Sequence, residues 1–130
     1  MSQRARRMVL WIGTTAWAGV IFSFSSLPGS KLPGRIPGEV GHFGVYAILG
    51  FLLYLALRVD LDPRRALVWA ILLASAYGVT DEFHQRFVIT RTPDVWDWVV
   101  DTLGAIVGAA LGWLLMRTAK LRHGPQVDTD

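Results

Sequence analysis

Four apolar blocks, each close to the length that crosses a lipid bilayer, dominate this sequence. They cover residues 8–26, 39–57, 63–85 and 93–116, and short polar segments separate them. A helix needs about 20 apolar residues to span the hydrocarbon core, because each residue advances the helix by only about 1.5 Å. Only helices and closed barrels satisfy all their backbone hydrogen bonds in lipid. The sequence therefore predicts an all-α, polytopic membrane protein built as a four-transmembrane-helix bundle.

Two proline-containing pairs predict where the third and fourth helices begin. Asp62-Pro63 and Thr92-Pro93 each place an N-cap side chain before a proline at the first helical position. Proline is tolerated there because the missing N–H would have no helical partner anyway. Residues 25–38 are rich in proline and glycine, which predicts the first loop.

The N-terminal block begins like a secretory signal peptide, with Arg4, Arg6 and Arg7 before an apolar run. No A-x-A-like cleavage site follows and the run is long for a signal peptide, so we expect a retained first transmembrane helix. The predicted organisation is a basic N-terminus at 1–7, a four-helix membrane domain at 8–116 and a polar tail at 117–130. We expect the end of the tail to be disordered.

The distribution of basic residues predicts the orientation. Because cytoplasmic segments are enriched in Lys and Arg, the side with more of them is expected to be cytoplasmic. Both termini are then cytoplasmic, in a multi-pass protein of the cytoplasmic membrane. One side carries nine of these residues (Arg4, Arg6, Arg7, Arg58, Arg64, Arg65, Arg117, Lys120, Arg122) and the other carries four (Lys31, Arg35, Arg86, Arg91).

Polar residues lie at the helix ends that this topology places on the outer face. The second helix begins there, the third ends there and the fourth begins there. Ser23, Ser25 and Ser26 at the end of the first helix face the same side. We predict a ligand-binding polar cluster at this face, formed by His42, Tyr46, Asp81, Glu82, His84, Gln85, Arg86, Arg91, Asp94, Asp97 and Asp101.

Asp101 is the least expected residue of this cluster. Asp94 and Asp97 lie near a helix N-terminus, where the helix dipole stabilises acids. Asp101 lies eight residues past Pro93, roughly 12 Å along the helix, and hence inside the membrane. A carboxylate there is a functional candidate by default, and a salt bridge that only stabilises the bundle is the alternative. The expected partner is Arg91, Arg86, His42, His84 or a bound cation.

Three glycines continue the face of the fourth helix that carries the aspartates. Gly104, Gly108 and Gly112 repeat every four residues, a spacing that allows close approach of another helix. Packing within the chain is the first interpretation. A homo-oligomer formed through these three glycines is the second.

A metal site has weak support in the sequence. Asp81-x-x-His84 has the i, i+3 spacing seen in metal-binding bundles, but there is no second copy. We expect no cofactor, with a metal ion as the alternative. The metal-ligand candidates are His42, Asp81, His84 and Asp101.

Arg86 and Arg91 depart from the positive-inside pattern. They either pair with the nearby acids or receive an anion, since arginine binds phosphate and carboxylate in a bidentate manner. Acids and arginines together fit a zwitterionic or metal-bridged headgroup better than a plain anion. The six tryptophans are expected to be interfacial anchors.

Several function classes are disfavoured. The absence of cysteine excludes disulfides and thiol chemistry. The basic residues flank apolar blocks and form no stripe, so nucleic-acid binding is not expected. No P-loop, HExxH or serine–histidine–acid spacing is present, and this gives no support for an enzyme.

Four segments together resemble VanZ-like membrane proteins over residues 10–115. The segments are FSFSSLP at 22–28, HFGVYAILGFLLY at 42–54, DEFHQRF at 81–87 and RTPDVWD at 91–97, followed by Asp101 and a GxxxG pattern. Family members often have a lysine shortly before the histidine of the second helix, where this chain has Val40, and asparagine in place of Asp101. The resemblance implies a bacterial cell-envelope role, and the founding member is associated with teicoplanin resistance.

Three hypotheses of function follow. The first is binding or handling of a polar lipid headgroup or a lipid-linked cell-wall precursor at the outer cluster, with glycopeptide resistance as one outcome. The second is a membrane enzyme acting on a lipid phosphate or ester, with Asp81 or Asp101 as the general base. The third is a structural or assembly subunit whose polar cluster only stabilises the bundle. Membrane lipids are the expected partners.

Overall fold

The computed structural model describes residues 1–28, 38–122 and 124, and it folds into four α-helices. They are α1 (Gln3–Ser25), α2 (Gly38–Leu57), α3 (Pro63–Gln85) and α4 (Val95–Arg122). All four are long and apolar enough to cross a membrane. The predicted all-α bundle of four transmembrane helices is confirmed, and the chain is a multi-pass membrane protein.

The structure confirms the predicted start of α3 and corrects the predicted start of α4. Asp62 caps α3 by accepting a hydrogen bond of 3.0 Å from the Arg65 N–H, as predicted. The predicted start of α4 at Pro93 is wrong: the helix begins at Val95, because the Asp94 carboxylate accepts a hydrogen bond of 2.9 Å from the Trp96 N–H. A carboxylate two residues downstream thus replaces Thr92 as the capping group.

Two helices are longer than their apolar blocks. α1 begins at Gln3, because Ser2 caps it by accepting a hydrogen bond of 3.1 Å from the Ala5 N–H. α4 continues past Met116 to Arg122 through residues that favour helix. Most of the predicted first loop, with Lys31 and Arg35, and most of the tail end predicted to be disordered lie outside the described residues.

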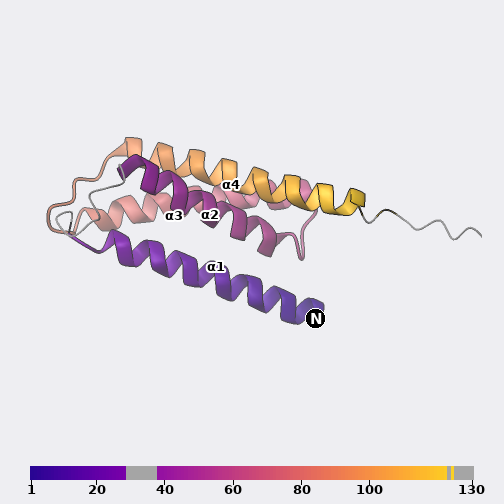
Figure 1. The fold of residues 1–130 in the computed structure, drawn as a ribbon. Helices are drawn as coiled ribbons and strands as arrows, with labels where there is room; N and C mark the ends of the chain where they lie inside the picture. Colours follow the sequence, from indigo (N-terminus) through magenta and orange to yellow (C-terminus); the bar gives the residue numbers. More distant parts are fainter. Residues whose placement is uncertain (29–37, 123, 125–130) are drawn as a thin grey trace, which may run out of the picture.

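The helices alternate in direction, so their ends meet in two groups (Figure 1). At one end, the N-terminus lies beside the connection between α2 and α3. Arg7 pairs there with Asp60, and the Gln3 side chain donates to the Val59 carbonyl. At the other end, α1 and α3 finish where α2 and α4 begin. This second end carries the polar residues predicted to converge.

The most extensive helix contact joins α2 and α4 and depends on glycine. A Cβ on Gly104 or Gly108 would overlap the backbone of α2 at Phe43 or Ala47. Gly50 of α2 lies equally close to the backbone of α4 at Ala105. Packing of the glycine face within the chain is therefore confirmed, because α2 covers these positions. The oligomeric state stays a prediction.

Small residues also bring α3 into the bundle, and α1 attaches through aromatic side chains. Ala66, Ala70, Ala74 and Gly78 recur every four residues along the buried face of α3. Small residues at such an interface let two backbones approach closely in a membrane. Two aromatic side chains form hydrogen bonds between α1 and its neighbours: Trp17 Nε1 donates to the Val45 carbonyl at 2.9 Å and Tyr77 Oη donates to the Ala18 carbonyl at 2.6 Å.

The outer surface is apolar along every helix. Large hydrophobic side chains are exposed on all four, among them Ile12, Ile48, Leu72 and Leu111. Water would disfavour such a surface, whereas lipid tails match it. Polar side chains are correspondingly concentrated in the interior at one end of the bundle.

Candidate functional site: a buried polar cluster between α2, α3 and α4

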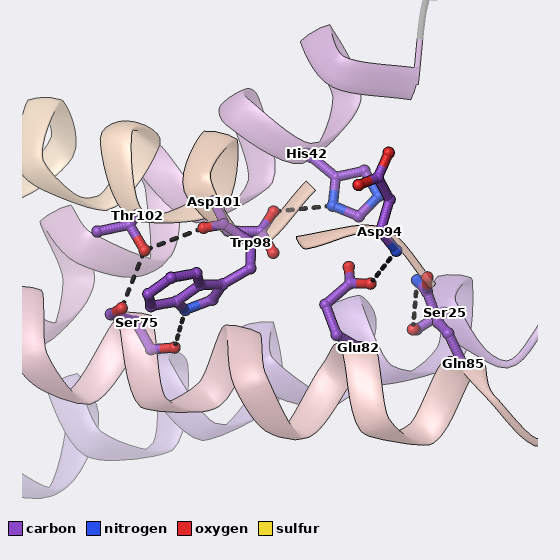
Figure 2. A network of polar contacts seen from close by, with 9 residues as sticks. All are labelled: Ser25, His42, Ser75, Glu82, Gln85, Asp94, Trp98, Asp101 and Thr102. Carbon is purple, nitrogen blue, oxygen red and sulfur yellow. Dashed lines mark hydrogen bonds and ion pairs between the residues drawn. The ribbon is translucent and has the colours of Figure 1, made fainter. Parts of the chain in front are cut away.

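Asp101 lies at the centre of the polar end and is completely buried. It projects from α4, a turn and a half after the helix begins, toward α2. Its Oδ1 atom is 2.8 Å from His42 Nδ1 (Figure 2). Of the partners expected from the sequence, the structure therefore selects His42. Asp101 lies in α4, which is long and apolar enough to cross a membrane, and its position inside the membrane stays a prediction.

Two carboxylate oxygens in this cluster are buried without a hydrogen-bond partner. One is Asp101 Oδ2 and the other is Glu82 Oε1. The second oxygen of Glu82 accepts a hydrogen bond of 3.1 Å from the Asp94 backbone N–H, which fixes the end of α3 against the start of α4. Gly78 makes room here, since a Cβ at that position would lie 3.3 Å from Asp101 Oδ2. Unsatisfied buried acceptors are rare and usually indicate strain, function or a missing ligand.

A second set of polar side chains lies on the side of the cluster nearer to α1. Gln85 Nε2 donates to Ser25 Oγ at 3.0 Å in a buried hydrogen bond, and Asp81 is only 5 % exposed. The hydroxyl of the fully buried Tyr46 is unpartnered and lies within electrostatic reach of Asp81. The structure thus places Gln85 against Ser25 and Tyr46 near Asp81.

His84 has a different environment from the one its spacing suggested. Its Nε2 atom is 3.0 Å from Ser26 Oγ, and its ring stacks on Phe22 at a centroid distance of 4.6 Å. Phe22 lies on α1, and Ser26 is the residue that caps its C-terminal end. Within the described part of the chain, the metal-ligating atoms that converge belong to His42, Glu82 and Asp101. The structure therefore does not bring His84 or Asp81 into that group, and it adds Glu82.

Arg91 and Arg86, which look equivalent in the sequence, have different surroundings. Arg91 donates to the Phe24 carbonyl at 2.9 Å and to the Leu27 carbonyl at 3.1 Å, so it caps the end of α1. Arg86 is exposed and lies over the Phe83 ring, 5.8 Å from its centroid. The ion pairs among the described residues do not include either arginine. The interpretation that both simply pair with acids is therefore not supported.

Replacing Arg91 by glutamine is expected to destabilise the bundle by about 1–2 kcal/mol, because the two carbonyls at the end of α1 lose charged donors. Thermal unfolding in detergent, followed by circular dichroism, measures the effect. Arg86→Gln is the matched control and should leave the transition nearly unchanged, since Arg86 donates no such capping bond. Equal losses in both variants would contradict the assigned role of Arg91.

A cavity of about 390 Å³ lies between the end of α3 and the start of α4. Several of its walls belong to the lipid-facing surface: Val79 is 52 % exposed, Phe83 59 % and Val95 74 %. Polar groups also line it, among them a cation and two carboxylates. The lining residues are Val79, Glu82, Phe83, Arg86, Pro93, Asp94, Val95 and Trp98.

Trp98 lines this cavity, whereas the sequence predicted an interfacial anchor at this position. Its Nε1 atom donates to the Ser75 carbonyl at 3.1 Å, which holds the indole between α3 and α4 (Figure 2). Ser75 Oγ in turn lies 2.9 Å from Thr102 Oγ1. Ser75 and Thr102 each lie within a largely apolar block, and these two hydroxyl residues are the sequence signal for a contact between α3 and α4. Asp97, by contrast, is half-buried at the rim and interacts electrostatically with His42 and Arg91.

The fold and the site together define a class: a small polytopic membrane protein with an ionisable cluster buried at one end of a four-helix bundle. The VanZ/LLP1 family matches residues 10–116, and the chain belongs to this family. An uncharacterized protein of Schizosaccharomyces pombe is 34 % identical over an alignment of 107 residues that covers 76 % of this chain. The alignment covers 65 % of that relative, just under two thirds of its length. No solved structure matches the chain.

Proposed function

We propose that this protein binds the headgroup of a zwitterionic phospholipid in the cavity between α3 and α4. The observation that carries the proposal is the lining of this cavity. It combines an apolar wall on the lipid-facing surface with one arginine and two carboxylates. A lipid entering sideways from the bilayer would keep its acyl chains against Val79, Phe83 and Val95.

The charges of the cavity match a headgroup that carries both signs. The guanidinium of Arg86 suits a phosphate, because its planar fork binds two oxygens at once. Asp94 lines the same cavity, is exposed and suits the ammonium group of the headgroup, and Glu82 adds a second negative charge to the lining. A purely anionic headgroup would meet two carboxylates for one arginine. A zwitterion therefore fits the cavity better than an anion.

The relative from a fungus supports a common membrane lipid as the ligand class. Phospholipids occur in fungi and bacteria alike, whereas fungi build no peptidoglycan. A lipid-linked cell-wall precursor, and with it a role in teicoplanin resistance, is a narrower proposal that rests on the VanZ resemblance alone. The distribution of Lys and Arg supports a cytoplasmic location for both termini and an outer location for the cavity.

Arg86→Gln is expected to lower phospholipid retention at least about tenfold, since a charged hydrogen-bonding group is worth about 1.5–3 kcal/mol. Native mass spectrometry in mild detergent, with phosphatidylethanolamine titrated onto the delipidated protein, measures the retention. Arg117→Gln is the matched control, because Arg117 also lies over an aromatic ring, Trp113, but at the opposite end of the bundle. Equal retention in the wild type and both variants would overturn the proposal.

A further inference from the structure

We infer that His42, Glu82 and Asp101 form a binding site for one divalent metal ion. This site shares Glu82 with the cavity between α3 and α4, but its other two ligands do not line that cavity, and metal binding requires no lipid. Each of the three residues offers one ligand atom, and these atoms all lie within 4.8 Å of one another. They come from three different helices, α2, α3 and α4, so the fold itself creates the arrangement.

The spacing of the ligand atoms is close to that of an assembled site. Ligand atoms around an ion at 2.0–2.2 Å are separated by roughly 3–4 Å. Nδ1 of His42 and Oδ1 of Asp101 are already 2.8 Å apart. The ligand atom that Glu82 offers lies within 4.8 Å of the other two, so it would move closer to them when an ion binds.

Unsatisfied oxygens point to a missing ligand at this place. Asp101 is fully buried, and its Oδ2 atom has no partner. In Figure 2 this oxygen points to the space beside Glu82, whose Oε1 atom is also buried and unpartnered. Each such acceptor costs about 1–3 kcal/mol if nothing binds it. One cation between the two carboxylates would satisfy both.

The local charge also favours a divalent cation. Glu82 and Asp101 bring two negative charges into a membrane-spanning region, where an uncompensated charge is costly. The nearby arginines do not offset them: the Arg91 guanidinium binds the carbonyls of Phe24 and Leu27, and Arg86 is exposed. A divalent ion with a neutral His42 offsets both carboxylates.

The donor set selects the kind of metal. One imidazole and two carboxylates suit Zn²⁺ or Mn²⁺ better than Ca²⁺ or Mg²⁺, which prefer oxygen ligands alone. Three protein ligands leave at least one coordination position open, as in catalytic zinc sites. The Asp94 N–H holds the other oxygen of Glu82 and so orients this ligand from behind.

Metal titration of the purified full-length protein tests the site. The protein is treated with a chelator in detergent, and Zn²⁺, Mn²⁺, Mg²⁺ and Ca²⁺ are titrated separately by calorimetry, with bound metal counted by mass spectrometry. We expect one Zn²⁺ or Mn²⁺ per chain and a higher melting temperature when it is bound. Glu82→Gln and His42→Gln should each weaken binding at least about a hundredfold, since each removes a direct ligand.

Glu39→Gln is the matched control, because Glu39 is an exposed acid in the first turn of α2 and offers no atom to the three-residue group. It should bind the metal as the wild type does. Asp101→Asn is a further variant, and if it fails to fold, Glu82→Gln decides the question because Glu82 is only partly buried. The inference is overturned if the wild type binds no ion, or if Glu82→Gln binds it as tightly as the wild type.

Discussion

Replacing His42 by leucine is expected to lower the free energy of unfolding by about 3–5 kcal/mol, the usual cost of removing one partner from a buried charged pair. Asp101 is completely buried, and His42 Nδ1 at 2.8 Å is its hydrogen-bond partner. Without the imidazole, the carboxylate would remain inside a transmembrane bundle with neither oxygen bound. Unfolding by sodium dodecyl sulfate in mixed micelles, followed by circular dichroism, measures the change.

A second substitution separates the loss of charge pairing from the change of shape. In the His42→Leu/Asp101→Asn double variant, the uncompensated charge is removed while the volume at position 101 hardly changes. We expect this variant to regain most of the lost stability, because the penalty comes mainly from the unpaired charge. A double variant as unstable as His42→Leu alone would show that side-chain shape dominates instead.

The same pair of variants distinguishes a structural role from a functional one. If the cluster only stabilises the bundle, restored stability should be accompanied by restored function in cells. If His42 and Asp101 bind a ligand, the stable double variant should remain inactive. We expect the double variant to be stable but inactive, because unsatisfied buried polar groups commonly occur in functional sites.

The fold could be predicted because its main determinants are local. The length of the four apolar blocks predicted the number of helices, and the pair Asp62-Pro63 predicted the start of α3. The start of α4 was misplaced because Thr92 and Asp94 are both good capping residues, and the tertiary contact between the Asp94 N–H and Glu82 favours the later one. The local sequence alone does not decide which of these two nearby residues caps the helix.

The site was only partly predictable because its contacts join residues far apart in the sequence. Convergence of polar helix ends followed from topology, but His42 and Asp101 are 59 residues apart, and four residues and a bound cation were candidate partners for Asp101. Arg91 caps α1 across 67 residues, and no pattern around it indicates this role. Glu82 rather than Asp81 offers a ligand atom close to His42 and Asp101, and the two acids are adjacent in the sequence, so their spacing alone does not distinguish them.

The second large effect is expected from Gly108→Ala, which should destabilise the protein by about 3 kcal/mol or more, at or above the upper end for overpacking. The new methyl group would overlap backbone atoms of Ala47 on α2. A backbone cannot rotate away as a side chain can, so α2 must shift as a unit. His42 lies on α2 about one and a half turns from Ala47, and the shift would also draw it away from Asp101.

Gly44→Ala is the matched control, since a Cβ at Gly44 on the same helix α2 has no neighbour within 4 Å. Alanine is favoured over glycine in a helix by up to about 1 kcal/mol, so this variant should be as stable as the wild type or slightly more so. The unfolding transition and Zn²⁺ affinity of both variants should be compared. Because the backbone contact between α2 and α4 sets the His42–Asp101 distance, Gly108→Ala should lose both stability and metal affinity. A Gly108→Ala protein that melts like Gly44→Ala would show that this contact does not limit how closely α2 and α4 approach.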